Sequence, residues 1–159
     1  MRSTRVSSGR FIDFFCLRRS EMLDPIQMSL RLAGSALDAQ SIRMRVISEN
    51  IANAHATASS PDEDPYRRKT VTFGSEMARQ DRVAYLAIKK IGTDEAPFRV
   101  VRDPGNPAAN SKGEVKMPNV DPILELADMR EANHGYQANL QVIRQAREIF
   151  SLTLDILKT

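Results

Sequence analysis

The sequence is short of aromatic side chains: they make up 6% of its 159 residues, and tryptophan is absent. Aromatic residues supply much of the buried area of a large core, so a single large core is not expected despite a hydrophobic content of 42%. The one cysteine, Cys16, excludes a disulfide within the chain. No stretch reaches the about 18 apolar residues typical of a membrane-spanning helix, so a direct membrane span is not expected.

Residue patterns typical of catalysis are also missing. The two histidines, His55 and His134, lie far apart in the sequence, and neither has a cysteine or carboxylate at the spacing of a metal site. No glycine-rich phosphate-binding sequence occurs. The acidic run at 62–64 and the basic triplet at 67–69 are interpreted as a solvated loop and the polar face of a strand. The sequence therefore predicts no enzyme, no metal and no cofactor.

The formal net charge of +3 is unevenly placed. Residues 1–21 contain five arginines and two acidic residues, which leaves the rest of the chain neutral and argues against nucleic-acid binding. The apolar stretch at 11–17 is short, is interrupted by an aspartate and precedes two arginines, unlike a cleavable signal peptide. Residues 1–21 are predicted to be a disordered extension or an artefact of start-site choice, with Met22 or Met28 as the working start.

A first long helix is predicted over residues 22–55. Asp24 and Pro25 fit the N-cap and the first helical position, because proline lacks the donor that would be unpaired there. The apolar residues then follow a heptad pattern with a second series three residues later, interrupted by the polar Gln40, which is typical of a coiled-coil seam. The two series are Leu30, Leu37, Met44 and Ile51, and Ala33, Gln40, Ile47 and Ala54.

A second long helix is predicted over residues 121–159, again with an acidic N-cap and a proline, Asp121 and Pro122. Its apolar stripe is broad, and a helix of this length overhangs a small domain, so part of the stripe needs a partner. Gly135 within it costs roughly 1 kcal/mol relative to alanine and suggests a close helix crossing. The stripe consists of Met129, Tyr136, Leu140, Val142, Ile143, Ala146, Ile149, Phe150, Leu154, Ile156 and Leu157.

Between the helices, residues 56–120 are predicted to form a loop and a small β-rich insert. Alternating or β-branched segments at 68–73, 83–91, 98–102 and 114–117 are typical of strands. Proline, glycine and asparagine at 103–107 predict a turn. The expected fold is mainly α with a small β insert, in which long N- and C-terminal helices form an open coiled coil.

Four ordered segments give the chain a family resemblance. The run SENIANA at 48–54 resembles the N-terminal motif of the flagellar axial proteins, the family of rod, hook and hook-filament junction subunits. PYRRKTVTF at 65–73, PFRVVRDPGNP at 97–107 and the segment at 113–139 are similar to proteins of the proximal rod in that family. The resemblance covers about residues 30–158.

The resemblance implies a structural subunit that polymerises helically into the drive shaft and export channel of the flagellar basal body. It implies a periplasmic position, and export through the flagellar type III apparatus without a cleaved signal. The implied partners are further copies of the chain, other proximal rod proteins, the adaptor at the membrane ring and the distal rod protein. A non-polymerising helical adaptor is the alternative.

The residues expected to form the assembly interface are the helix seams, with four asparagines fixing register through polar bonds. On the first helix they are Leu30, Leu37, Met44, Ile47, Asn50, Ile51 and Asn53. On the second they are Met129, Asn133, Tyr136, Asn139, Leu140, Ile143, Ala146, Ile149, Phe150, Leu154 and Leu157.

Overall fold

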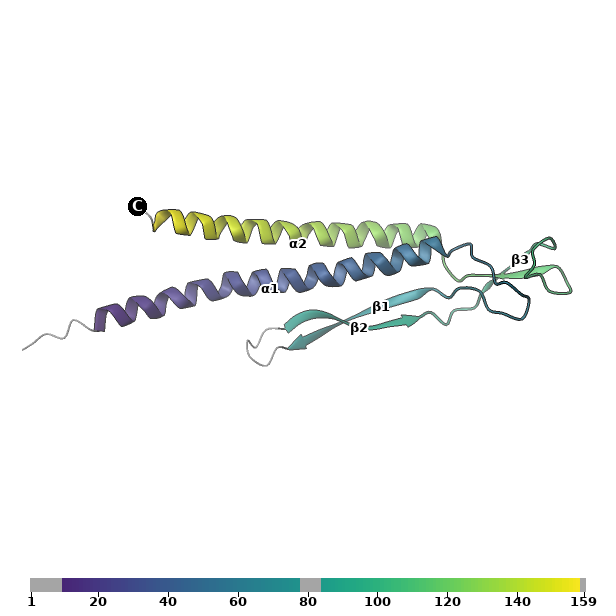
Figure 1. Ribbon diagram of the computed structural model, residues 1–159, viewed down its shortest axis with the longest axis horizontal. Helices are drawn as coiled ribbons and strands as arrows, with labels where there is room; N and C mark the ends of the chain where they lie inside the picture. The colour runs from purple at the N-terminus through teal and green to yellow at the C-terminus, as the bar shows by residue number, and fades with distance from the viewer. Residues whose placement is uncertain (1–9, 78–83, 158–159) are drawn as a thin grey trace, which may run out of the picture.

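The computed structural model describes residues 10–77 and 84–157, with side chains from Pro25 onward. Helices α1 and α2 lie side by side and run in opposite directions, and the β1–β2 hairpin lies along another side of α1 (Figure 1). Strands β3 and β4 pair beyond the end of the helices (Figure 1). The elements are α1 (Arg10–Ala52), β1 (Lys69–Met77), β2 (Ala84–Thr93), β3 (Arg99–Arg102), β4 (Glu114–Met117) and α2 (Pro122–Ile156).

The expectation of a mainly α open coiled coil is wrong. The two helices take half of the chain, and two separate antiparallel sheets take about a fifth. A helix in a two-stranded coil buries its heptad seam, whereas α1 also buries Ala39 and Val46, which lie outside the predicted seam. The reason is a second layer: α1 packs against α2 and also against the β1–β2 hairpin. The arrangement is therefore layered, with α1 between α2 and the hairpin.

Helix α1 begins well before the start expected at Asp24 and Pro25. It runs from Arg10 and contains Pro25 in its interior. Proline cannot donate a backbone hydrogen bond, so α1 lacks the i→i−4 hydrogen bond that another residue would donate at position 25. The Ser29 hydroxyl donates to the Pro25 carbonyl at 2.8 Å one turn later. The predicted division of the chain into an extension, a first helix, an insert and a second helix, with boundaries after residues 21, 55 and 120, stays a prediction.

The start of α2 is confirmed. A side-chain oxygen of Asp121 accepts the backbone N–H of Ile123 at 2.9 Å, and Pro122 is the first helical residue. The four strand segments are also found, with β1 and β2 longer than expected. The pairing of β1 with β2 shifts by one residue between Thr72 and Phe73, where the hairpin has a bulge.

The buried core is built from small side chains. Among the residues whose side chains the structure describes, six of the ten buried hydrophobic ones are alanines, and none is aromatic. Small residues let helices approach closely but bury little apolar area per residue. Many large apolar side chains are left exposed on both helices, so much of the apolar surface of the chain lies outside its own core.

Replacing Gly135 by alanine is expected to stabilise the chain by about 1 kcal/mol, because glycine is unfavourable inside a helix. A methyl group there would meet the Gln40 side chain of α1 at 3.4 Å, an ordinary van der Waals distance. The two helices are thus close at this point yet leave room for it. Urea unfolding of the purified chain measures the change. Gly34→Ala is the matched control, since nothing lies within 4 Å of a methyl group at that α1 position. A loss of stability in Gly135→Ala alone would contradict the expectation.

Candidate functional site

The side chain of Asn50 connects three elements near the end of α1. It is 1% exposed and makes four hydrogen bonds. Its amide nitrogen donates to the Lys69 carbonyl at 2.9 Å and to Glu125 Oε2 at 3.1 Å. Its oxygen accepts the Lys69 N–H at 2.9 Å and the Tyr66 hydroxyl at 2.8 Å. We call Asn50, Tyr66, Arg68, Lys69 and Glu125 the polar node.

Glu125 brings α2 into the polar node. This carboxylate is also 1% exposed, and it accepts a hydrogen bond from Arg68 Nε at 2.6 Å in addition to the bond from Asn50. Buried charges are tolerated when they are paired and hydrogen-bonded, which is the case here. Arg68 continues to Asp128 Oδ2 at 3.3 Å on the next turn of α2. The node therefore ties α1, β1 and α2 together through directional bonds.

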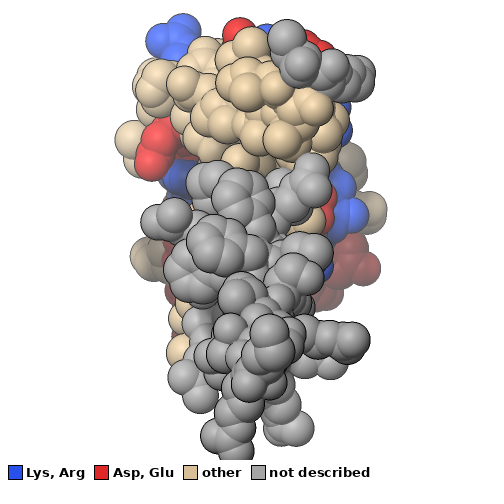
Figure 2. Space-filling view, turned by 90° about the vertical axis from the view of Figure 1, so that its left-hand side faces the viewer, with Lys and Arg blue, Asp and Glu red and all other residues tan. Residues whose placement is uncertain are grey.

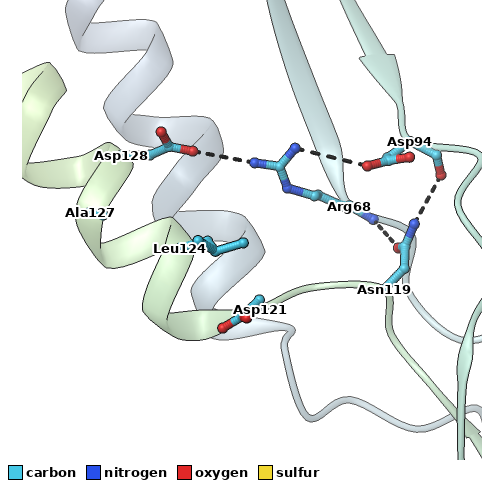
Figure 3. Close-up of a pocket in the computed structure, with 7 residues that line it drawn as sticks. All are labelled: Arg68, Asp94, Asn119, Asp121, Leu124, Ala127 and Asp128. Atoms are coloured by element: carbon cyan, nitrogen blue, oxygen red, sulfur yellow. Dashed lines mark hydrogen bonds and ion pairs between the residues drawn. The ribbon is translucent and has the colours of Figure 1, made fainter.

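A pocket of about 360 Å³ opens beside the polar node. Figure 3 shows the Arg68 guanidinium between Asp94 and Asp128, with the Arg68 backbone N–H donating to Asn119 at 2.8 Å. Asn119 in turn donates to the Asp94 carbonyl at 3.1 Å, which fixes the segments after β2 and before α2 to each other. The lining residues are Arg68, Asp94, Asn119, Asp121, Leu124, Ala127 and Asp128.

The pocket is lined mainly by polar and charged residues. Its lining has neither a histidine nor a cysteine. Within the described residues, no three histidine, cysteine or acidic side chains come close enough to hold a metal ion. In the same part of the chain, no helix is both long and apolar enough to cross a membrane.

Replacing Tyr66 by phenylalanine is expected to change the pH dependence of stability at high pH. Burial raises the pKa of Tyr66 to about 12, and the nearby charges of Glu49 and Glu125 add to the effect. Free tyrosine has a pKa of about 10. The folded chain thus holds the hydroxyl proton of Tyr66 more tightly than the unfolded chain does. Its contribution to the free energy of unfolding is present below about pH 10 and is lost as the pH rises towards about 12.

In the Tyr66→Phe variant, the part of the stability loss at high pH that comes from the Tyr66 hydroxyl should be missing. It should also be less stable by about 1 kcal/mol at neutral pH, because the hydrogen bond to Asn50 is gone. Urea unfolding across this pH range measures both effects. Tyr136→Phe, on α2 and away from the node, is the control. Parallel pH curves for Tyr66→Phe and the unmodified chain would contradict the assignment.

The last turns of α2 carry a second notable surface. Within the described residues its exposed large apolar side chains are Ile149, Phe150, Leu152, Leu154, Ile156 and Leu157. We call these six residues the apolar end of α2. Figure 2 faces this end of the molecule, and the surface at its top, over α2, consists mainly of uncharged residues. An exposed apolar patch of this kind marks an interaction surface.

The predicted interface residues occupy very different environments, and their role in assembly stays a prediction. Ile47, Asn50 and Ala146 are buried within the chain. Half-buried are Leu30, Leu37, Met44, Ile51, Asn53, Met129, Tyr136, Asn139, Leu140 and Ile143. Exposed are Asn133, Ile149, Phe150, Leu154 and Leu157.

The four asparagines expected to fix register behave differently from one another. Asn50 bonds across elements, as described above. Asn53 donates to the Glu49 carbonyl and Asn139 to the Gly135 carbonyl, each at 2.8 Å within its own helix. The side chain of Asn133 likewise accepts from Gln137 on α2.

Sequence reasoning did not find the partners of Asn50. In the sequence, Glu125 is an ordinary acidic residue in the first turn of a helix, where a negative charge interacts favourably with the helix dipole. Arg68 reads as part of a basic triplet on a strand. The available signal was weak: a tyrosine and an arginine two residues apart, next to the first strand.

Comparison with known proteins gives the class. Residues 30–58 match the family described as flagella basal body rod protein, and residues 111–156 match flagellar basal body rod FlgEFG protein C-terminal. The two matched segments are the C-terminal half of α1 with the loop that follows it, and β4 with α2. The chain thus has both terminal segments of a flagellar basal-body rod protein.

Relatives that match most of the chain identify the family within this class. The flagellar basal-body rod protein FlgC of Agrobacterium fabrum is 54% identical over 136 residues, 86% of this chain and 98% of the relative. FlgC of Salmonella typhimurium is 38% identical and FlgC of Yersinia enterocolitica 40% identical, each over 79% of this chain and 92% of the relative. The chain belongs to the FlgC family of flagellar basal-body rod proteins, which confirms the resemblance seen in the sequence.

Proposed function

We propose that this chain is a structural subunit of the bacterial flagellar rod and polymerises helically into the drive shaft. Its family is one of structural basal-body proteins and not of enzymes. The observation that carries the proposal is the apolar end of α2, where six large apolar side chains are each more than 40% exposed. When a neighbouring subunit covers such a surface, the contact is stabilised by about 25 cal/mol for each Å² of apolar area removed from water.

The chain supports an open polymer. The two ends of the helix pair differ, since one carries the apolar end of α2 and the other adjoins strands β3 and β4 (Figure 1). A contact in which one patch meets a different patch on the next subunit leaves both outer patches free for further copies. A series of such contacts gives a helical filament when the rotation does not close into a ring.

The partners and the position are also part of the proposal, and they are supported by the resemblance to rod proteins. We place the chain in the proximal rod, within the periplasm, between the membrane ring and the distal rod. Its neighbours there are further copies, other proximal rod proteins, the adaptor at the membrane ring and the distal rod protein. Its function is to transmit torque and to line the channel through which the flagellar type III apparatus passes its substrates. The chain itself leaves by that route without a cleaved signal.

Fractionation tests the proposal. Basal bodies purified in detergent from cells that carry a tagged copy should contain the chain in a fixed ratio to other rod proteins. Deletion of the gene should remove the rod and motility, and the tagged copy should restore both. A non-polymerising helical adaptor would use the same apolar surface in a finite complex, and the chain would then be missing from purified basal bodies. That result would overturn the proposal.

A further inference from the structure

Strand β3 is an unusual strand because all four of its residues, Arg99–Arg102, are exposed. Val100 is 58% exposed and Val101 40% exposed. The strand pairs with β4 on one side, and in the described part of the chain no strand pairs with its other edge. Side chains alternate between the faces of a strand, so each face of β3 presents one valine and one arginine.

The two arginines of β3 have no charge partner in the described residues. Arg99 and Arg102 both lack a carboxylate within 4.0 Å there, whereas Arg43, Arg67 and Arg68 all have one. On one face of β3 the exposed Val100 thus lies beside the unpaired Arg102, which is a combination suited to an apolar contact with an acidic rim.

The start of α2 presents a matching surface. Ile123 is 77% exposed, Leu124 63% and Leu126 52%, which leaves the first two turns with large apolar side chains in water. We call Ile123, Leu124 and Leu126 the α2 start surface. Leu124 also lines the pocket beside the polar node (Figure 3).

Negative charge is in excess next to the α2 start surface. Four of the five adjoining carboxylates are paired with two guanidinium groups, those of Arg43 and Arg68, and Asp121 accepts a backbone N–H, which leaves a surplus of acidic groups. In one copy both the α2 start surface and β3 are exposed, so they do not cover each other within the subunit. The carboxylates are those of Asp94, Asp121, Glu125, Asp128 and Glu131.

We propose that β3 of one copy packs on the α2 start surface of a neighbouring copy. This inference rests on the proposed function, because it requires copies to meet in a polymer. Val100 would cover the exposed leucines and isoleucine, and Arg102 on the same face of β3 would neutralise surplus carboxylates at the rim. One patch meets a different patch, so the contact repeats from copy to copy instead of closing as a two-fold dimer.

Cross-linking tests the contact in whole basal bodies. Val100→Cys and Leu124→Cys are combined with Cys16→Ser, which removes the native thiol. Treatment with a short thiol-reactive cross-linker should produce dimers and higher multiples of the chain. Each single cysteine variant should give none. Val100→Cys with Met77→Cys is the matched control, because Met77 is about as exposed as Leu124 and lies at the far end of β1.

The possible outcomes distinguish a failure of the proposed contact from a failure of the proposed function. If the chain is present in basal bodies but gives no multiples, with this pair and with the second pair Val100→Cys and Leu126→Cys, the contact is overturned and the rod assignment stands. A product with a different rod protein would overturn a second copy as the occupant. If the unmodified chain is missing from basal bodies, the proposed function itself fails.

Charge reversal gives a second measurement. Arg102→Glu should reduce the amount of the chain in basal bodies about tenfold or more, as expected when a rim pair becomes repulsive. Lys90→Glu makes the same change of charge on an exposed position of β2 and should leave the amount near normal. Equal effects of the two variants would overturn the role of β3.

Discussion

Replacing Phe150 by aspartate is expected to abolish rod assembly and motility while the free chain stays folded. Phe150 belongs to the apolar end of α2 and is 43% exposed in the single chain. Surface substitutions usually change the free energy of unfolding by less than about 0.5 kcal/mol, so the monomer should tolerate the change. In an apolar contact between subunits the new carboxylate would lose its water without a partner, at a cost of several kcal/mol.

The matched control for Phe150→Asp is Ser151→Asp. Ser151 is the next residue and is also exposed, so both variants add the same charge near the C-terminus of α2, where it opposes the helix dipole. The control should assemble and swim. Swimming in soft agar and the content of the chain in purified basal bodies measure the result. Ile143→Asp should also block assembly, but Ile143 is half-buried, so this variant tests the monomer as well. Normal motility of Phe150→Asp would refute the role of this surface.

Replacing Asn50 by alanine is expected to destabilise the free chain by about 3–5 kcal/mol, because several buried polar groups lose their partners together. The groups left behind are the backbone N–H and carbonyl of Lys69, the Tyr66 hydroxyl and one oxygen of Glu125. Loss of the Glu125 contact also weakens the tie between α1 and α2. Urea unfolding of the purified chain, followed by circular dichroism, measures the change.

Asn53→Ala is the control for Asn50→Ala. The two asparagines lie three residues apart in the SENIANA run, but Asn53 makes its side-chain bond to a carbonyl of its own helix. Loss of that bond should cost about 1 kcal/mol or less. If both variants lost similar stability, the importance of the polar node would be refuted.

Local signals in the sequence predicted the local structure well. Asp121 and Pro122 begin α2 as expected, and β4 has the predicted bounds. An N-cap and a short strand depend on neighbouring residues, so their pattern is visible in a short window. The same type of signal failed at Asp24 and Pro25, since a helix that starts earlier can continue through a proline.

The layered arrangement could not be predicted because it depends on contacts between distant segments. The heptad pattern of α1 accounts for one buried face. Burial of Ala39 and Val46 required knowledge that the hairpin packs on a further face. The polar node is similar, since Asn50 and Glu125 are separated by 75 residues. Their residue types are ordinary for helix ends, and only the fold brings them together.

The position of the polar node has a mechanical consequence. Asn50 and Arg43 bond to Glu125, Asp128 and Glu131 in the first turns of α2, at the end of the helix pair nearest the strands. Apolar packing between alanines resists separation but lets helices slide or rotate, whereas a hydrogen bond weakens steeply when it is bent. Torsional stiffness of the subunit is therefore greatest at the node. A twisting load on the helices reaches β1 there, through Arg68 and Lys69.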